Sequence, residues 1–264
     1  MIELKNLRKV FYEGSPYEKE AIKSINLRVN EGDFITIIGS NGSGKTTLFN
    51  LIAGTFLPTN GRIYVNDRDV TEQDEYKRAC YIGRIYQNPL LGTASGMTVE
   101  ENVALAMKKG LRGLAISLNK ELREEIRDKL KLLGMNLENR LKEPVSLLSG
   151  GQRQALTLLM AILSKPLLLL LDEHTAALDP RNAKIVLDLT RRFIEENKLT
   201  ALMVTHNMLQ AIELGNRLLM MDEGEIILDV SGDEKKSLTV EKLVEKFHSI
   251  RRHSIESDEV LLVE

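Results

Sequence analysis

The segment at residues 39–46, GSNGSGKT, constrains this chain more than any other feature. It follows an apolar, β-branched run at 34–38, which is typical of a strand buried on both faces of a parallel sheet. It precedes a stretch at 46–53 that we predict to be a helix ending at Gly54, where glycine readily adopts the left-handed conformation. The order strand, glycine-rich loop, helix predicts an α/β fold whose ligands bind at this loop.

The glycine-rich segment fits the pattern G-x-x-x-x-G-K-[ST] of a phosphate-binding P-loop. Its glycines let successive N–H groups point at phosphate oxygens, and the next helix presents its positive end to the same anion. Lys45 is expected to reach the β and γ phosphates, and the Thr46 hydroxyl to bind Mg²⁺. The predicted nucleotide-binding residues are Gly39, Ser40, Asn41, Gly42, Ser43, Gly44, Lys45, Thr46 and Thr47. The loop alone does not separate kinases, GTPases and ATP-driven machines.

Two carboxylates, Asp172 and Glu173, follow a run of leucines at 167–171. This run predicts a second buried strand that ends at the same sheet edge as the glycine-rich loop. Because successive side chains of a strand point to opposite sides, the two carboxylates need different tasks. We assign Asp172 to Mg²⁺ or its water shell, and Glu173 to the attacking water as general base. A strand at 201–204 and an intervening helix at 182–196 complete a βαβ pattern.

The remaining segments predict two further subdomains. Residues 2–4, 25–29 and 62–65 alternate apolar and polar side chains, as half-exposed antiparallel strands do. The region from about 88 to 165 is charged and leucine-rich, which predicts an α-helical subdomain inserted in the core. We therefore predict one domain over residues 1–230, with a mostly parallel sheet, an antiparallel β subdomain and the inserted helical subdomain.

Residues 231–264 are predicted to form a C-terminal helical tail. Its apolar positions recur with helical spacing and predict a stripe that packs on the chain's own core, with a partner-docking role as the alternative. The stripe consists of Val240, Leu243, Val244 and Phe247. We expect the last residues, 255–264, to be frayed.

Composition limits the location and the partners. With 36 Lys plus Arg against 38 Asp plus Glu, the formal charge is −2, so no nucleic-acid partner is expected. The single cysteine, Cys80, cannot form an internal disulfide and favours a reducing cytosol. The N-terminal residues lack the apolar stretch of a secretory signal, and the leucine run is far shorter than the roughly 20 residues of a membrane span. Work at a membrane would therefore require attachment to its surface or to a partner.

The segment LSGGQRQ at 148–154 resembles the LSGGQ signature of ATP-binding cassette (ABC) ATPases. Further elements of that family lie in the expected order. Gln87, in YQNP, resembles the Q-loop, residues 177–179 resemble the D-loop, and His206, in VTHN, resembles the switch histidine. The resemblance covers roughly residues 1–230 and implies the P-loop NTPase fold and hydrolysis of ATP.

The resemblance also implies how the site is completed. Two copies would form a head-to-tail dimer in which each ATP lies between the P-loop of one copy and the signature of the other. The signature begins an apolar helix, so its N-terminus would face phosphate. The residues implied there are Ser149, Gly150, Gly151 and Gln152.

Three residues have catalytic roles by resemblance. Glu173 would activate water, His206 would sense the γ phosphate, and Gln87 would contact Mg²⁺ or water and connect the core with the helical subdomain. The implied metal set is Thr46, Gln87 and Asp172.

An aromatic residue near the N-terminus stacks on adenine in this family, and Phe11 matches best, with Tyr12 as the alternative. His174 departs from the family pattern, which commonly has proline after the catalytic glutamate, so the stiffness of this loop is expected to differ. The remaining histidines, His174, His248 and His253, have no metal-ligand spacing, and no zinc site is predicted.

The architecture resembles transporter subunits most. The chain has one cassette, with neither a long coiled-coil insertion nor a second cassette. This implies that the chain lies at the cytoplasmic face of the membrane, where it is held by separate transmembrane permease subunits. A short permease helix would dock near Gln87. The stretches at 88–90 and 97–102 resemble uptake systems for small solutes such as amino acids, which implies an extracytoplasmic solute-binding protein. The extension at 13–20 resembles export and lipoprotein-release ATPases, and a soluble non-transport ATPase is the third alternative.

Overall fold

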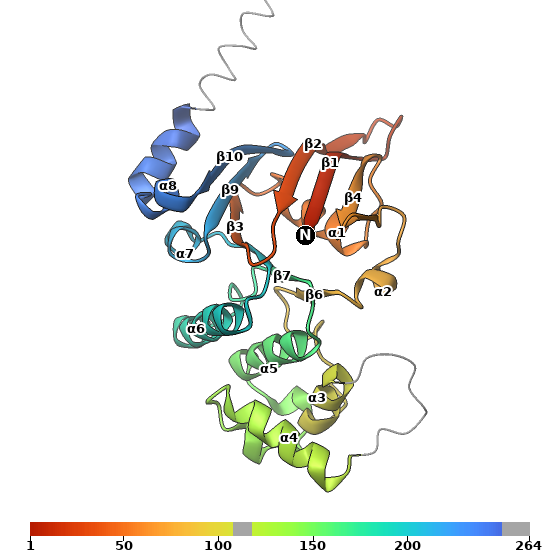
Figure 1. The fold of residues 1–264 in the computed structure, drawn as a ribbon, viewed down its shortest axis with the longest axis vertical. Coiled ribbons are helices and arrows are strands. Elements are labelled where there is room, and N and C mark those ends of the chain that lie inside the picture. Colours follow the sequence, from red (N-terminus) through yellow and green to blue (C-terminus); the bar gives the residue numbers. More distant parts are fainter. Residues whose placement is uncertain (108–117, 250–264) are drawn as a thin grey trace, which may run out of the picture.

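The structure is a computed structural model that describes residues 1–107 and 118–249. A six-stranded sheet with the order β10-β9-β3-β8-β7-β6 forms its centre (Figure 1). All neighbouring pairs are parallel except β9 and β10. The strands are β3 (Phe34–Gly39), β6 (Ile82–Ile85), β7 (Leu168–Asp172), β8 (Ala201–Val204), β9 (Arg217–Asp222) and β10 (Glu225–Ser231). The prediction of a mostly parallel α/β sheet is confirmed.

A second, antiparallel sheet has the order β2-β1-β4-β5. Its strands are β1 (Ile2–Phe11), β2 (Lys19–Val29), β4 (Asn60–Val65) and β5 (Arg68–Asp69). The three predicted segments lie within β1, β2 and β4, which are longer than predicted. Alternation along β1 is interrupted because its register with β2 shifts after Leu4, near Asn6, whose φ of 48° is left-handed.

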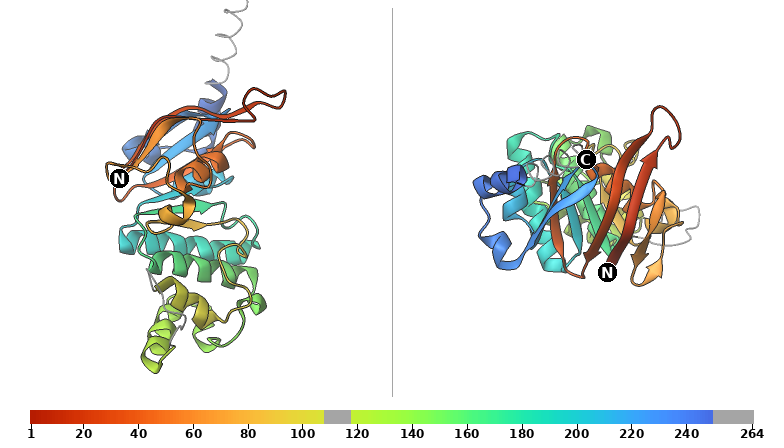
Figure 2. Two further views of the ribbon diagram at one scale, coloured as in Figure 1. Left: turned by 90° about the vertical axis from the view of Figure 1, so that its right-hand side faces the viewer. Right: turned by 90° about the horizontal axis from the view of Figure 1, so that it is seen from above.

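The helix α1 (Lys45–Ala53) lies between the two sheets. Its buried residues share one apolar cluster with Ile2 and Leu4 of β1 and Ile35 of β3. The opposite face of the central sheet is covered by α5 (Gly150–Leu163) and α6 (Pro180–Asn197), whose apolar residues cluster with Leu169 and Met203. Figure 2 shows these layers from the side. The β-branched and leucine-rich strands are covered on both faces, as their composition predicts.

The region predicted as helical, 88–165, lies away from the antiparallel sheet (Figure 1). Its described residues form α3 (Val99–Met107), α4 (Lys120–Lys131), the 3₁₀ turns Leu137–Asn139 and Val145–Leu147, and α5. Within the described part of this region, the β structure is one isolated bridge between Thr98 and Pro144. The short helices α2 (Glu75–Arg78), α7 (Met208–Glu213) and α8 (Gly232–Lys236) complete the order.

The tail packs on the chain itself. Residues 240–249 are helical, and Leu243 is fully buried in a cluster with Leu218 and Val230, against which Phe247 also packs. Packing on the core thus accounts for much of the predicted stripe. The proposed boundary at 230 falls at the penultimate residue of β10, and the segment predicted to fray, 255–264, lies outside the described residues, as does His253. Among the described helices, none combines the length and apolarity that a membrane crossing requires.

Candidate functional site

The loop between β3 and α1 depends on glycine at two positions. Gly39 has a φ of 157°, and a Cβ there would lie 2.2 Å from the carbonyl oxygen of Met221. Gly44 has a φ of 101°, and a Cβ there would lie 2.7 Å from the carbonyl oxygen of Ala21. Any larger residue would force the backbone apart at either position. The loop therefore lies close to neighbouring strands and leads into the N-terminus of α1, where an anion is favoured.

Lys45 folds back over this loop. Its Nζ donates to the carbonyl oxygens of Gly39 and Ser40, each at 2.8 Å, and to Ser43 Oγ at 3.3 Å. The residue is only 6% exposed. Burial lowers the pKa of the Lys45 ammonium, and the carboxylates of Glu173 and Asp172 oppose this shift. A cation with two nearby carboxylates is thus held beside the N–H groups that would receive phosphate.

Asp172 ends β7 and lies beside the guanidinium of Arg84, a residue to which the sequence analysis gave no role. Arg84 Nη2, from the neighbouring strand β6, is 3.4 Å from Asp172 Oδ2. Burial raises the pKa of the Asp172 carboxyl, while Arg84, Lys45 and His206 partly oppose the shift. The carboxylate is therefore poorly hydrated and already surrounded by positive charge. A metal ion would bind there only if it could compete with Arg84 for the carboxylate.

Glu173 is directed by the backbone rather than by strand alternation. The strand ends at Asp172, and Glu173 adopts a left-handed φ of 46° while its N–H donates to Val204 O at 3.1 Å. Strand alternation therefore does not explain the separation of the two carboxylates. A left-handed non-glycine residue is costly and, at an observed position such as this, is a signal of function. The turn carries the Glu173 side chain toward β8 and the residue after it.

Glu173 and His206 form a direct pair. Glu173 Oε1 lies 2.5 Å from His206 Nε2. The imidazole therefore donates a hydrogen bond from its Nε2–H to the carboxylate. The Glu173 side chain is 14% exposed and the His206 side chain 46% exposed. His206 follows β8, which pairs with both β3 and β7, and this sheet order brings the two residues to the P-loop. The pair can hold and orient a water beside the phosphate site.

One cavity of 410 Å³ unites most of the predicted residues. It brings together the P-loop, the Glu173 and His206 pair, and the N-terminal aromatic residue Phe11. Its lining is Phe11, Lys19, Ala21, Asn41, Gly42, Ser43, Gly44, Lys45, Thr46, Thr47, Glu173 and His206. Of the two aromatic candidates, Phe11 lines the cavity, whereas Tyr12 is 73% exposed and lies outside this lining. The Phe11 ring meets Phe56 edge-on, with centroids 5.3 Å apart.

The signature lies apart from this cavity. Ser149 caps α5, accepting from Gln152 N–H, and the Gln152 side chain in turn accepts from Ser149 N–H. Gly151 allows α5 to approach α6, since a Cβ there would lie 2.6 Å from the Asn182 side chain. Ser149, Gly150, Gly151 and Gln152 are absent from the described lining of the P-loop cavity. One chain thus presents two separate helix N-termini, at α1 and at α5, each of which would favour an anion.

Gln87 lies two residues after the end of β6, beyond Tyr86, and is exposed. It is likewise not among the described residues that line the P-loop cavity. The preceding residue connects this segment to the helical region, because the buried Gln154 of α5 donates through Nε2 to Tyr86 O at 3.3 Å. Gln87 is therefore near the junction that the resemblance implies, and it is exposed to solvent.

Two contacts that support the P-loop come from a segment that sequence reasoning did not place. Ser40 Oγ donates to Asp222 Oδ1 at 3.1 Å, and Gly224 N–H donates to Ser43 O at 3.1 Å. Both partners lie at the turn between β9 and β10. The apolar run at 218–221 followed by DEG is a strand and turn signal that could have located this segment. The role of the turn at the P-loop depends on sheet order, which local sequence does not encode.

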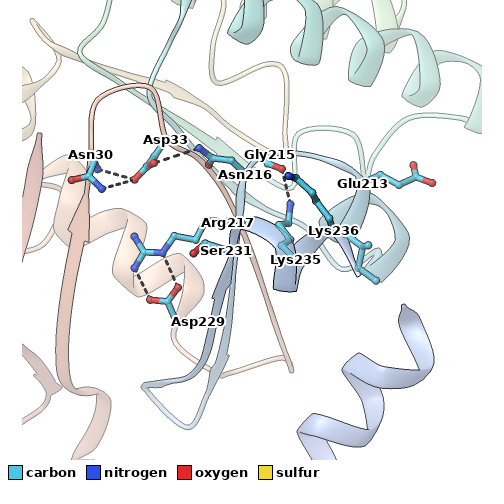
Figure 3. Close-up of a pocket in the computed structure, with 12 residues that line it drawn as sticks. Asn30, Asp33, Glu213, Gly215, Asn216, Arg217, Asp229, Ser231, Lys235 and Lys236 are labelled. Atoms are coloured by element: carbon cyan, nitrogen blue, oxygen red, sulfur yellow. Dashed lines mark hydrogen bonds and ion pairs between the residues drawn. The ribbon is translucent and has the colours of Figure 1, made fainter. Parts of the chain in front are cut away.

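A larger cavity of 890 Å³ lies where β9 begins, beside α8 (Figure 3). Its charged groups serve contacts within the chain. Arg217 pairs with both carboxylate oxygens of Asp229, and Lys235 Nζ donates to the carbonyl oxygens of Leu214 and Gly215. Burial lowers the pKa of Lys235 to about 8. These contacts engage the Arg217 and Lys235 cations within the chain, and the Lys235 contacts attach α8 to the end of α7.

His174, which replaces the family's common proline, is fully enclosed. Its Nε2 lies 3.0 Å from Thr190 Oγ1, and the Thr190 hydroxyl donates to Val186 O at 2.8 Å. Nε2 is therefore the protonated nitrogen. Burial lowers the pKa of His174 from 6.5 to about 4. The residue joins the end of β7 to α6 as a neutral imidazole.

This environment makes stability depend on pH. Between pH 4 and 6.5 the unfolded chain binds more protons at His174 than the folded chain, so stability falls as pH falls through that window. At pH 5 this residue should cost about 2 kcal/mol of unfolding free energy relative to pH 7. We expect His174→Gln to lose that part of the pH dependence, measured by urea unfolding at both pH values. The exposed His248→Gln is the matched control and should keep the native slope; equal slopes for all three proteins would contradict the prediction.

Comparison with known proteins agrees with this site. The family model described as "ABC transporter" matches residues 22–176. The chain is 42% identical over 250 residues to the "Tyrosine transport ATP-binding protein" of Clostridioides difficile (strain R20291), covering 94% of this chain and 98% of that protein. It is 33% identical over 233 residues to the "Energy-coupling factor transporter ATP-binding protein EcfA2" of Clostridium tetani (strain Massachusetts / E88), covering 86% and 78%.

Solved structures show the same fold. A dimeric ATP-binding cassette in a post-hydrolysis state bound to ADP and Pi has a TM-score of 0.74 and 29% identity, covering 88% of this chain and 98% of that one. The cbiO1 protein of Clostridium perfringens, part of the ABC transporter complex cbiONQ, has a TM-score of 0.74 and 26% identity, with 93% of each chain covered. The chain therefore belongs to the ABC transporter family, as an ATP-binding subunit that hydrolyses ATP.

Proposed function

We propose that this chain powers uptake of a small solute, with an amino acid as the first candidate, through separate membrane permease subunits. The observation that carries this proposal is the near full-length similarity to a tyrosine transport ATP-binding protein. The similarity to energy-coupling factor proteins favours a second candidate, uptake through that type of transporter. The export alternative is supported only by the extension at 13–20, and a soluble non-transport role by no particular contact.

The residues of the P-loop cavity divide the chemistry between them. The loop N–H groups and Lys45 bind the phosphates, Phe11 stacks on the base, and Glu173 deprotonates or orients the attacking water. His206 holds Glu173 through their 2.5 Å contact and thereby keeps the carboxylate beside the P-loop. A bound nucleotide would shield Glu173 and His206 from bulk solvent. Water would then reach the γ phosphate only in a defined position.

The oxygen donors near Asp172 fit Mg²⁺. This cation prefers oxygen ligands and usually takes one or two protein groups in addition to substrate phosphates. Thr46 lines the P-loop cavity, and Asp172 ends β7, which is separated from β3 by β8 in the sheet. We propose Thr46 and Asp172 as the protein side of the site, with Gln87 joining after it turns inward. Mg²⁺ bound there would neutralise charge on the β and γ phosphates.

We infer that two copies complete the site. The signature N-terminus lies apart from the P-loop cavity of its own chain, and a similar cassette is described as dimeric with ADP and Pi. A head-to-tail dimer would place each Ser149 N-terminus at the nucleotide of the other copy. ATP would then stabilise the closed dimer and hydrolysis would release it.

Exposed leucines near Gln87 provide the surface for a permease. Leu90 and Leu91 are 47% and 67% exposed, and Leu147 is 66% exposed. The loop that carries Leu90 and Leu91 is joined to the turn that carries Leu147 by a hydrogen bond from Ser146 N–H to Ser95 O at 3.2 Å. An amphipathic helix of a permease could dock on such a surface and bring this chain to the cytoplasmic face of the membrane.

The proposal is tested by purifying tagged Glu173→Gln protein with MgATP from detergent-solubilised native cells. We expect a multispanning permease to co-purify, together with a solute-binding protein, and tyrosine to stimulate ATP hydrolysis by the complex that native protein forms with them. Leu91→Asp is expected to reduce capture of the permease without changing nucleotide affinity. Capture of soluble proteins alone would exclude the transport function, and a permease complex stimulated by a different solute would exclude tyrosine.

A further inference from the structure

Arg84 places a guanidinium directly beside the carboxylate that we assign to the metal site. It extends from β6, the parallel neighbour of β7, and its Nη2 lies 3.4 Å from Asp172 Oδ2. The Arg84 side chain is 11% exposed and that of Asp172 is 13% exposed. Because little solvent reaches the pair, its charges are weakly screened. A positive charge therefore acts on Asp172 from within the fold.

The rest of the Arg84 environment is only partly satisfied. The guanidinium carbon lies 4.7 Å from the centroid of the Tyr86 ring, and Nη1 donates to Thr55 Oγ1 at 3.4 Å. The Nε atom is buried and has no hydrogen-bond partner among the described residues. A guanidinium carries five N–H donors, and those of Arg84 find only long contacts. Its place is thus set chiefly by stacking and by attraction to Asp172.

We propose that Arg84 is a positioning residue that competes with the divalent cation for Asp172, and so sets the metal concentration at which the site fills. The inference rests on the proposed role of Asp172. Two cations that share one carboxylate repel each other, so the guanidinium weakens metal binding. At low metal concentration it also neutralises Asp172 and keeps the carboxylate in place. Among the described residues, the polar contacts of Arg84 are with Asp172 and Thr55, neither of which belongs to the P-loop, so Arg84 acts through Asp172.

The test measures metal binding rather than turnover. Mn²⁺ is titrated into protein that is saturated with a non-hydrolysable ATP analogue, and free Mn²⁺ is quantified by electron paramagnetic resonance. Removal of the charge in Arg84→Gln should lower the Mn²⁺ midpoint by roughly threefold to tenfold, whereas Arg84→Lys should stay within about twofold of the native value. Arg68→Gln removes an exposed arginine on β5 and is the matched control, with no expected shift.

The outcomes separate this inference from the proposed function. Asp172→Asn should raise the midpoint; if it does not, the assignment of Asp172 itself fails. If Asp172→Asn raises the midpoint but Arg84→Gln leaves it unchanged or raises it, only the role of Arg84 is overturned. Arg84→Met keeps an apolar stem against Tyr86 and decides the question if the glutamine variant does not fold. Equal shifts in Arg84→Lys and Arg84→Gln would show a structural role instead of a charge effect.

Discussion

A Glu173→Gln variant is expected to bind MgATP and to hydrolyse it roughly 100-fold to 10,000-fold more slowly than the native chain. The amide keeps the size of the side chain and can still accept the proton of His206 Nε2, which lies 2.5 Å from Glu173 Oε1. It cannot take a proton from water. Because binding is retained while turnover is lost, the protein should accumulate as an ATP-bound dimer. Phosphate release and light scattering after size-exclusion chromatography with MgATP measure the two effects.

The control for this variant is Glu196→Gln, which changes an exposed acid near the C-terminus of α6, beyond the lining of the P-loop cavity. It should hydrolyse ATP at the native rate. Native turnover in Glu173→Gln would remove Glu173 from the proposed mechanism. Slow turnover without a dimer would keep the role of Glu173 as base but contradict the proposal that ATP stabilises the closed pair.

The second large effect concerns nucleotide binding. Lys45→Ala should weaken ATP affinity by roughly tenfold to 100-fold, since a hydrogen bond to a charged group contributes about 1.5 to 3 kcal/mol. In the folded chain the Lys45 ammonium is already buried beside the P-loop carbonyls, at 2.8 Å from Gly39 O and Ser40 O. Binding of phosphate therefore requires only a short movement of a placed cation. Affinity is measured by equilibrium titration with a fluorescent ATP analogue.

Lys23→Ala is the matched control, because Lys23 is a half-buried lysine that lies outside the lining of the P-loop cavity and pairs with Glu223 and Glu225. It should bind ATP as the native chain does. Thermal unfolding without nucleotide checks that the Lys45 variant is folded. A folded Lys45→Ala protein with native ATP affinity would contradict the assignment of the P-loop.

The glycine-rich loop, the leucine run and the order of strands and helices were predictable because each depends on neighbouring residues. A glycine-rich loop between an apolar strand and a helix has one dominant structural meaning, and a run of leucines predicts a strand buried on both faces. Four of the five leucines are fully buried in β7, whereas Leu167 precedes the strand and is 48% exposed. Packing then confirmed the expected C-cap, since Gly54 ends α1 with a φ of 84°. Helix and strand ends differed by one to several residues, because termini are set by capping contacts that periodicity does not report.

The placement of Glu173 could be predicted only in part. The sequence places a carboxylate just after a buried strand, but strand alternation was the wrong reason for its direction. Its left-handed φ of 46° and its bond to Val204 O come from the adjacent strand β8. Such a conformation for a non-glycine residue persists because the surrounding hydrogen bonds outweigh its local cost.

The sequence by itself determined the P-loop, the two carboxylates, the signature and the mostly parallel α/β sheet, because short-range patterns of glycine, charge and apolar residues encode them. Only the tertiary structure decided that Arg84 meets Asp172, that the turn after β9 supports the P-loop, and that the signature lies apart from the phosphate site of its own chain. These contacts join segments that are distant along the chain. They depend on the sheet order and register, which arise from packing of the whole core rather than from any local pattern.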